Sequence, residues 1–218
     1  TGAGSITVVR AADLATERTL RNAGDGVESL AFFPDGRRLV SGSVLYNAQG
    51  ENRGQADIWD ADTGERLVRL TGPDEHVLDT DVSADGTQIA TAGIDWDVPG
   101  RHNDFFVKLW DAKTGEPVHR LAGHLLAPRG AAFFPDGRRV ISAGIDRAVI
   151  VWDAREGREL LRLSHVSQPA NDVAVSPDGA SVAVAFADGR VRVFHAAPWE
   201  PAAGDDAATP DGAIEEQR

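Results

Sequence analysis

An all-β fold, a β-propeller of four-stranded antiparallel blades, is predicted by three observations on this sequence. A turn that ends in Asp-Gly recurs with its aspartates at 35, 85, 136 and 178, so the spacings are 50, 51 and 42 residues. A Trp-Asp marker follows each of the first three turns, with its Trp at 59, 110 and 152, and a degraded copy follows the fourth turn at Phe194. β-Branched and aromatic runs separate the markers, and no stretch has helical spacing.

The third unit shows the expected strands best, at 131–134, 139–143, 148–152 and 159–163. The turn between the first two strands has a physical basis, because Pro presets φ, Asp caps its own backbone and Gly accepts a positive φ. Four strands in about 42 residues are typical of one propeller blade.

The markers divide the chain into blades at 25–72, 73–123, 124–164 and 165–196, the last of them incomplete. Residues 1–24 are interpreted as the last two strands of a preceding blade or as closing strands. Residues 197–218 are acidic and rich in Pro, Ala and Gly, which predicts a disordered tail.

Two arrangements of these blades follow, a small closed ring or an arc of a larger propeller. The chain has no methionine, not even a first one, and this favours a piece of a longer protein. An open arc would expose strand edges, through which we expect self-association.

Composition excludes several classes of function. Lys+Arg 22 against Asp+Glu 34 gives a net charge of −12, which phosphate backbones repel, so no nucleic acid is expected as a partner. The longest apolar run, 182–187, is far shorter than the roughly 18 residues that span a bilayer, so we expect no membrane insertion. A cytoplasmic location is a separate expectation. The chain has no cysteine, and its six histidines lack the spacing of metal ligands, so neither a metal nor another cofactor is expected.

The order of the markers resembles the WD-repeat β-propeller family over about residues 6–194. That order is Gly-His, an apolar strand, the Asp-Gly turn, a Ser/Thr strand, an aspartate and Trp-Asp. The resemblance implies a structural tetrad in the third unit, made of His124, Ser142, Asp146 and Trp152. The second unit keeps Thr91, Asp95 and Trp110, but Pro73 stands in place of the histidine, and His76 is a candidate substitute.

His124, Ser142 and Asp146 also have the composition of a hydrolase triad, in which His takes the Ser proton and Asp orients the His. The family resemblance implies instead a structural network beneath the ring of Trp152. The second unit repeats the pattern with Thr91, Asp95 and Trp110. This repetition favours the structural interpretation, because a single active site would not repeat. We therefore expect no catalytic residue and no enzyme.

The hairpin that precedes each Trp differs in length. The chain advances 10 positions from Ser142 to Trp152, but 18 from Ser41 to Trp59 and 19 from Thr91 to Trp110. By the resemblance, this hairpin lies on the face where partners dock. Its aromatic, arginine and polar residues are candidates for partner binding: Tyr46, Asn47, Arg53, Trp96, Arg101, His102 and Phe105. Neutral drift in loop length is the alternative.

These observations favour a non-catalytic scaffold module that binds a protein or a peptide. The alternative is the C-terminal sensor or docking region of a larger bacterial signalling protein, resembling Ser/Thr kinases with propeller tails. A propeller enzyme that uses His124 and Asp146 ranks third. The bacterial origin is an expectation from the lysine-poor, Ala- and Gly-rich composition.

Overall fold

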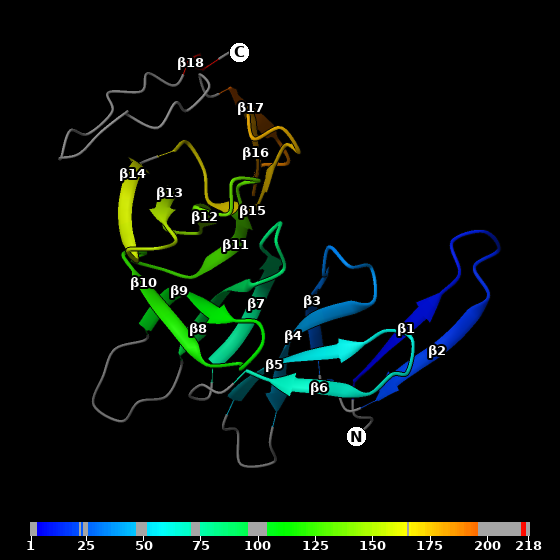
Figure 1. Ribbon diagram of the computed structural model, residues 1–218. Coiled ribbons are helices and arrows are strands. Elements are labelled where there is room, and N and C mark those ends of the chain that lie inside the picture. Colours follow the sequence, from blue (N-terminus) through cyan, green and yellow to red (C-terminus); the bar gives the residue numbers. More distant parts are fainter. Residues whose placement is uncertain are drawn as a thin grey trace.

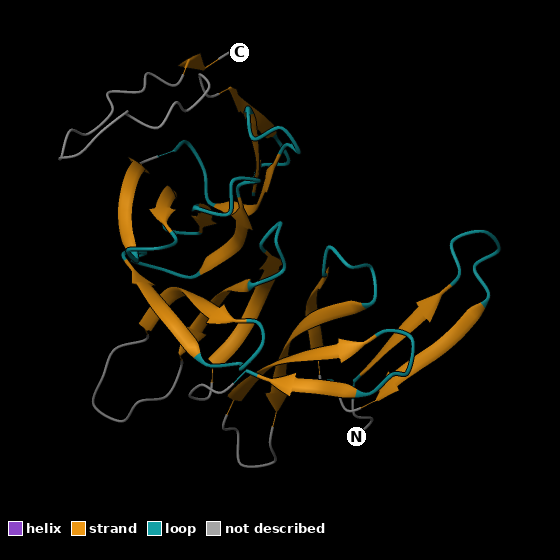
Figure 2. Cartoon of the chain, viewed as in Figure 1, coloured by secondary structure: helices purple, strands orange, loops and turns teal. Residues whose placement is uncertain are grey.

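The computed structural model describes residues 4–21, 23, 26–46, 52–70, 75–95, 104–164, 166–195 and 215–216. Within these residues every regular element is a β-strand, as Figure 2 shows, and the predicted all-β class is confirmed. The strands form one two-stranded sheet and four four-stranded sheets, all with antiparallel neighbours. We name the sheets blades 0 to 4 in chain order.

The strands of each blade follow one another along the chain. Blade 0 holds β1 (Ser5–Val9) and β2 (Thr16–Arg21). Blade 1 holds β3 (Gly26–Phe32), β4 (Arg38–Tyr46), β5 (Asn52–Asp60) and β6 (Arg66–Arg69). Blade 2 holds β7 (Glu75–Val82), β8 (Gln88–Asp95), β9 (Asp104–Asp111) and β10 (Pro117–Ala122).

Blade 3 holds β11 (Pro128–Phe133), β12 (Arg139–Gly144), β13 (Ala148–Asp153) and β14 (Arg158–Ser164). Blade 4 holds β15 (Ala170–Val175), β16 (Ser181–Phe186), β17 (Val191–His195) and a two-residue strand, β18 (Glu215–Glu216). β18 pairs with Phe194 and His195 and was not expected from the sequence. The rest of the acidic tail, 197–214 and 217–218, lies outside the described residues.

The repeated Asp-Gly turn joins the first and second strands of each blade. In blade 3, Asp136 Oδ1 accepts the backbone N–H groups of Arg138 and Arg139, at 2.8 and 3.1 Å. Gly137 has φ +64°, a conformation that costs a residue with a Cβ about 1–2 kcal/mol. The motif therefore recurs because each blade needs the same tight turn.

The blades stand side by side in an open arc (Figure 1). The first strands of blades 1 to 4, β3, β7, β11 and β15, are neighbours in that order along its inner side. Blade 0 and blade 4 lie at opposite ends of the arc, so the described residues do not form the small closed ring that the sequence also allowed.

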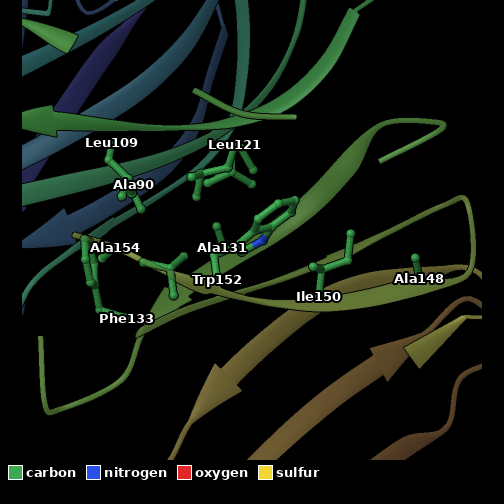
Figure 3. Packing of buried hydrophobic residues seen from close by; sticks show 12 residues of the cluster. Ala90, Leu109, Leu121, Ala131, Phe133, Ala148, Ile150, Trp152 and Ala154 are labelled. Atoms are coloured by element: carbon green, nitrogen blue, oxygen red, sulfur yellow. The ribbon is translucent and has the colours of Figure 1, made fainter. Parts of the chain in front are cut away.

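The core lies between blades. Figure 3 shows Leu109 and Leu121 of blade 2 on one side of a cluster and Trp152 and Ile150 of blade 3 on the other. Trp152 is 2% exposed. Trp110 occupies the same position between blades 1 and 2, and Trp59 between blades 0 and 1. Each Trp therefore faces the preceding blade, where truncation of such a side chain typically costs 3–5 kcal/mol.

Candidate functional site

A chain of hydrogen bonds joins four side chains of blade 3. His124 Nδ1 lies 3.0 Å from Asp146 Oδ2, and His124 Nε2 lies 2.8 Å from Ser142 Oγ. Trp152 Nε1 donates to the same Ser142 Oγ at 2.8 Å. His124 precedes β11 and Asp146 lies in the β12–β13 turn, so the fold brings the expected tetrad of this blade together.

The network is buried and its polar groups have partners. Asp146 also accepts the backbone N–H groups of Leu125 and Ala148, at 2.8 and 3.1 Å. Burial acts to raise the pKa of Asp146, but the bonds from His124 and these N–H groups outweigh it and lower the pKa. Ser142 is fully buried and its Oγ contacts two partners, so its hydroxyl is not presented to a substrate.

The Trp–hydroxyl bond repeats in two other blades. Trp110 Nε1 donates to Thr91 Oγ1 and Trp59 Nε1 to Ser41 Oγ, both at 2.9 Å and both buried. His76 is buried in β7, where its backbone pairs with Ile94. Burial lowers the pKa of His76, although the charge of Glu28 acts to raise it. The side chain of Asp95 lies outside the described residues.

The two long hairpins are extended strand pairs. β4 and β5 have nine residues each and β8 and β9 have eight, whereas β12 and β13 have six. The β4–β5 ladder continues to the Tyr46↔Asn52 pair, and the β8–β9 ladder to Asp95↔Asp104. At about 3.4 Å per residue, two or three more residues per strand carry these tips roughly 7–10 Å beyond a short hairpin. Both project from the same side of the arc (Figure 1).

A buried carboxylate supports the base of the β4–β5 hairpin. Asp57 on β5 is fully buried, and its Oδ1 accepts Arg69 Nε of β6 at 2.9 Å. Gln55 Nε2 donates to Asp57 Oδ2, and Gln55 O accepts the hydroxyl of Ser43 at 3.1 Å. These bonds tie β4, β5 and β6 together below the projecting part.

The structure describes only part of the expected partner-binding set. Tyr46 and Arg53 lie on the paired strands of the first hairpin, although their side chains lie outside the described residues. Phe105 is half-buried on β9, opposite Ile94. The other four candidates lie outside the described residues: Asn47, Trp96, Arg101 and His102.

Two aspartates that the sequence analysis missed lie on β7 and bond across the boundary to β11. Asp79 Oδ2 accepts the N–H of Ala131 at 2.8 Å, and Asp81 Oδ2 accepts that of Phe133 at 2.7 Å. Burial raises the pKa of Asp79 to about 7 and also raises that of Asp81. The signal was two aspartates at alternate positions of a strand, Glu75–Val82, because Asp is usually depleted in strands.

A cavity of about 300 Å³ lies beside these aspartates, between β3, β7, β11 and β15. Within the described part of the chain, no three His, Asp or Glu side chains gather in a way that could hold a metal ion. The same residues include no helix able to cross a lipid bilayer.

The model of one family, "WD domain, G-beta repeat", matches residues 15–44, 115–153 and 157–195. The chain belongs to the WD-repeat family. Members of this family are generally non-catalytic scaffolds that bind other proteins. The matched ranges leave out residues 45–114, which contain the tips of both long hairpins.

Several WD-repeat relatives are similar to part of the chain. Human WD repeat and SOCS box-containing protein 1 is 32% identical over 108 residues, 49% of this chain and 24% of that protein. Protein HIR1 of Candida albicans is 30% identical over 131 residues, 56% of this chain and 14% of that protein. Nuclear distribution protein PAC1-1 of Uncinocarpus reesii is 28% identical over 144 residues, 61% of this chain and 30% of that protein. The chain thus spans less than a third of each relative.

Proposed function

We propose that this chain is a non-catalytic scaffold that binds a protein or a peptide at the face where the two long hairpins project. The observation that carries the proposal is the extension of the β4–β5 and β8–β9 ladders beyond the β12–β13 ladder. A paired ribbon is stiffer than an irregular loop, so it presents its side chains at a smaller entropic cost on binding.

The residues on these hairpins have the chemistry of an interface. Tyr46, Trp96 and Phe105 are aromatic, and Arg53 and Arg101 are arginines, the types that interfaces enrich. The tips of both long hairpins lie in residues 45–114, outside the ranges that the family model matches.

We assign the blade 3 network a structural role that supports this face. Burial of His124 and Ser142 and the full set of bonds to Asp146 favour this role over catalysis. The network holds the short β12–β13 hairpin against the segment that precedes β11. We expect loss of this network to lower the stability of the fold. Binding at the hairpin face would change only as a consequence of that lower stability.

An affinity capture with matched variants tests the proposal. The binding variant carries alanine at the long-hairpin positions Tyr46, Arg53, Trp96 and Arg101. The control variant carries Arg147→Ala and Arg190→Ala, both in short hairpins and both exposed. Proteins captured from a lysate of the source organism are quantified by mass spectrometry, and melting temperatures are measured in parallel.

We expect the wild type and the control to capture the same protein, and the binding variant to capture at least about 10-fold less, because interface aromatics and arginines often contribute about 2 kcal/mol each. Equal melting temperatures would show that the loss is local. Loss of the partner by the control alone would place the binding face elsewhere.

A second candidate function is a docking region within a larger signalling protein. The name of the human relative joins WD repeats to a SOCS box, and this chain spans 24% of that protein. The reading frame around the coding sequence of this chain tests the idea directly. A signalling domain encoded in the same frame supports it, and a frame without one contradicts it.

A further inference from the structure

A buried lysine lies on β9, near the base of the second long hairpin. Lys108 is 6% exposed. Its Nζ lies 4.7 Å from the centroid of the Phe106 ring and 5.4 Å from the Trp110 ring. These three residues alternate along β9, so they share one face of blade 2. Only two of the 22 Lys and Arg residues in the chain are lysines, Lys108 and Lys113.

An arginine lies directly opposite this lysine on the outer strand of the blade. Arg120 of β10 pairs with Lys108 in the ladder. Its guanidinium carbon lies 4.8 Å from the centroid of the same Phe106 ring. Like charges at directly opposite positions of an antiparallel pair are destabilising. Blade 2 therefore places two positive groups where an opposite-charge pair would be favourable.

Blade 1 has such an opposite-charge pair at the equivalent position. Asp57 and Lys108 each lie two residues before the Trp of their blade. Asp57 pairs with Arg69 in the ladder, as Lys108 pairs with Arg120. Asp57 is fully buried, and its Oδ1 accepts Arg69 Nε at 2.9 Å. A carboxylate at this position thus bonds to the arginine of the outer strand.

We propose that Lys108 Nζ is a site of reversible carbamate formation with carbon dioxide. The lone pair of the neutral amine attacks the carbon of CO2 and a C–N bond forms. One C=O electron pair moves to its oxygen, and a proton passes from Nζ to water. The product, –NH–COO⁻, replaces a cation by an anion opposite Arg120. Blade 2 then has the carboxylate–arginine pair that blade 1 has in Asp57 and Arg69.

The environment of Lys108 favours the neutral amine that this reaction needs. Burial, and to a smaller extent the charge of Arg120, lower the pKa of Lys108 from 10.5 to about 8. At about pH 7.5, roughly a quarter of this side chain is then neutral, against about 0.1% for an ordinary lysine. A lysine that loses its charge on burial is a typical nucleophile, whereas an arginine stays protonated.

Burial also selects the reagent. An amine in a residue that is 6% exposed is not open to an enzyme that carries an acyl group. Carbon dioxide is uncharged and triatomic, so it reaches sites that larger acyl donors do not. Arg120, which is exposed, provides the planar pair of N–H donors that matches a carboxylate. The site therefore combines a neutral amine with a cation that holds the product.

The carbamate would join β9 to β10 at the base of the second long hairpin. Asp57 joins β5 to β6 below the first long hairpin in the same way. The firmness of the second hairpin then depends on carbon dioxide, whereas that of the first does not. Because the test of this site needs no binding partner, its outcome is independent of the proposed scaffold function.

Chemical trapping on the full chain tests the site. The protein is equilibrated with bicarbonate and treated with triethyloxonium, which converts a carbamate into a stable ethyl ester, and peptides are mapped by mass spectrometry. We expect at least about 10-fold more adduct on Lys108 than on Lys113, an exposed lysine in the β9–β10 turn. Arg120→Gln should reduce the Lys108 adduct at least about 5-fold, because it removes the cation that pairs with the carbamate. Lys113→Arg should leave it unchanged.

Hydrogen exchange with and without bicarbonate measures the consequence. In the wild type we expect slower exchange in β9 and β10 when bicarbonate is present, and no change in β5 and β6, the internal control. Lys108→Glu carries a permanent carboxylate, so it should show the slower exchange in both buffers. Lys108→Arg should show the faster exchange in both.

Melting curves show whether each variant folds. Absence of an adduct on Lys108 of the folded wild type would overturn the proposal, as would equal labelling of Lys108 and Lys113. An adduct that Arg120→Gln does not reduce would contradict the pairing with Arg120. Exchange that bicarbonate leaves unchanged in a trapped wild type would overturn the role of the carbamate at the hairpin base.

Discussion

The backbone N–H of Phe133 donates to Asp81 Oδ2 at 2.7 Å, across the boundary between blades 2 and 3. Among the residues that the structure describes, no β-ladder crosses this boundary, so the side chain of Asp81 accepts a hydrogen bond that a neighbouring strand would accept within a sheet. Asp79 does the same for Ala131. The inner edge of β11 is thus capped by two carboxylates, at the cost of partly burying both of them.

That burial makes stability depend on pH. The pKa of Asp79, raised by burial to about 7, lies above its usual 3.8, so the folded protein holds this proton more tightly than the unfolded chain. The stabilisation is complete below about 3.8 and is lost as pH rises to about 7. Between about pH 5.5 and about pH 8, we expect Asp79→Asn to gain about 2 kcal/mol relative to wild type. Urea denaturation at each pH measures it.

The matched control for this prediction is Asp62→Asn, at an exposed aspartate that pairs with Arg37 on the surface. Its stability relative to wild type should stay within about 0.5 kcal/mol across the same range. If the difference between Asp79→Asn and wild type does not change with pH, the folded-state pKa of Asp79 is not raised.

Truncation of the blade 3 histidine should destabilise the fold. His124→Ala removes the partner of Asp146 and of Ser142 in a buried network, which we expect to cost on the order of 1–3 kcal/mol. His195→Ala, at an exposed histidine bonded to Ser181, should cost less than about 0.5 kcal/mol. Thermal melts compare the two. An unchanged midpoint for His124→Ala, or loss of a hydrolytic activity at unchanged stability, would contradict the structural role.

A methyl group added at Gly130, where β11 packs closely against β15, should push these two strands apart. A Cβ on Gly130 would lie 2.8 Å from the backbone N of Val173 and 3.0 Å from Cα of Asp172, neither of which a rotamer change can move. We expect Gly130→Ala to cost about 1–3 kcal/mol. Gly26→Ala is the control, because its nearest neighbour would be 3.6 Å away. Equal unfolding midpoints for both variants would show that β11 and β15 do not pack this closely.

Removal of the carboxylate at the base of the first long hairpin should loosen that hairpin. Asp57→Ala leaves Arg69 and Gln55 without their buried acceptor, which we expect to cost about 1–3 kcal/mol. Hydrogen exchange should accelerate in β4 and β5 more than in β8 and β9, which serve as the internal control. Uniform acceleration in both hairpins would mean that Asp57 supports the whole fold and has no local role.

Much of the blade architecture was predictable because its signals are local. Asp136 and Gly137 form the expected turn through bonds within four residues, and the expected strand at 139–143 overlaps β12, Arg139–Gly144. Trp152 and Ser142 could be paired only through the family resemblance, since they lie 10 positions apart and the strand register brings them together. The sequence showed that the long hairpins contain extra residues, but not that these residues lengthen both strands.

By itself, the sequence determined the all-β class, the repeated turn and the Trp that each of blades 1 to 3 presents, because these depend on neighbouring residues and on periodicity. Tertiary structure alone decided the open arc, the capping of β11 by Asp79 and Asp81 and the exposure of Leu30 and Phe32. Phe32 and Phe133 occupy the same position in the same motif, yet one is exposed and the other buried. Burial depends on what lies opposite in space, and for β3 and β11 those neighbours differ.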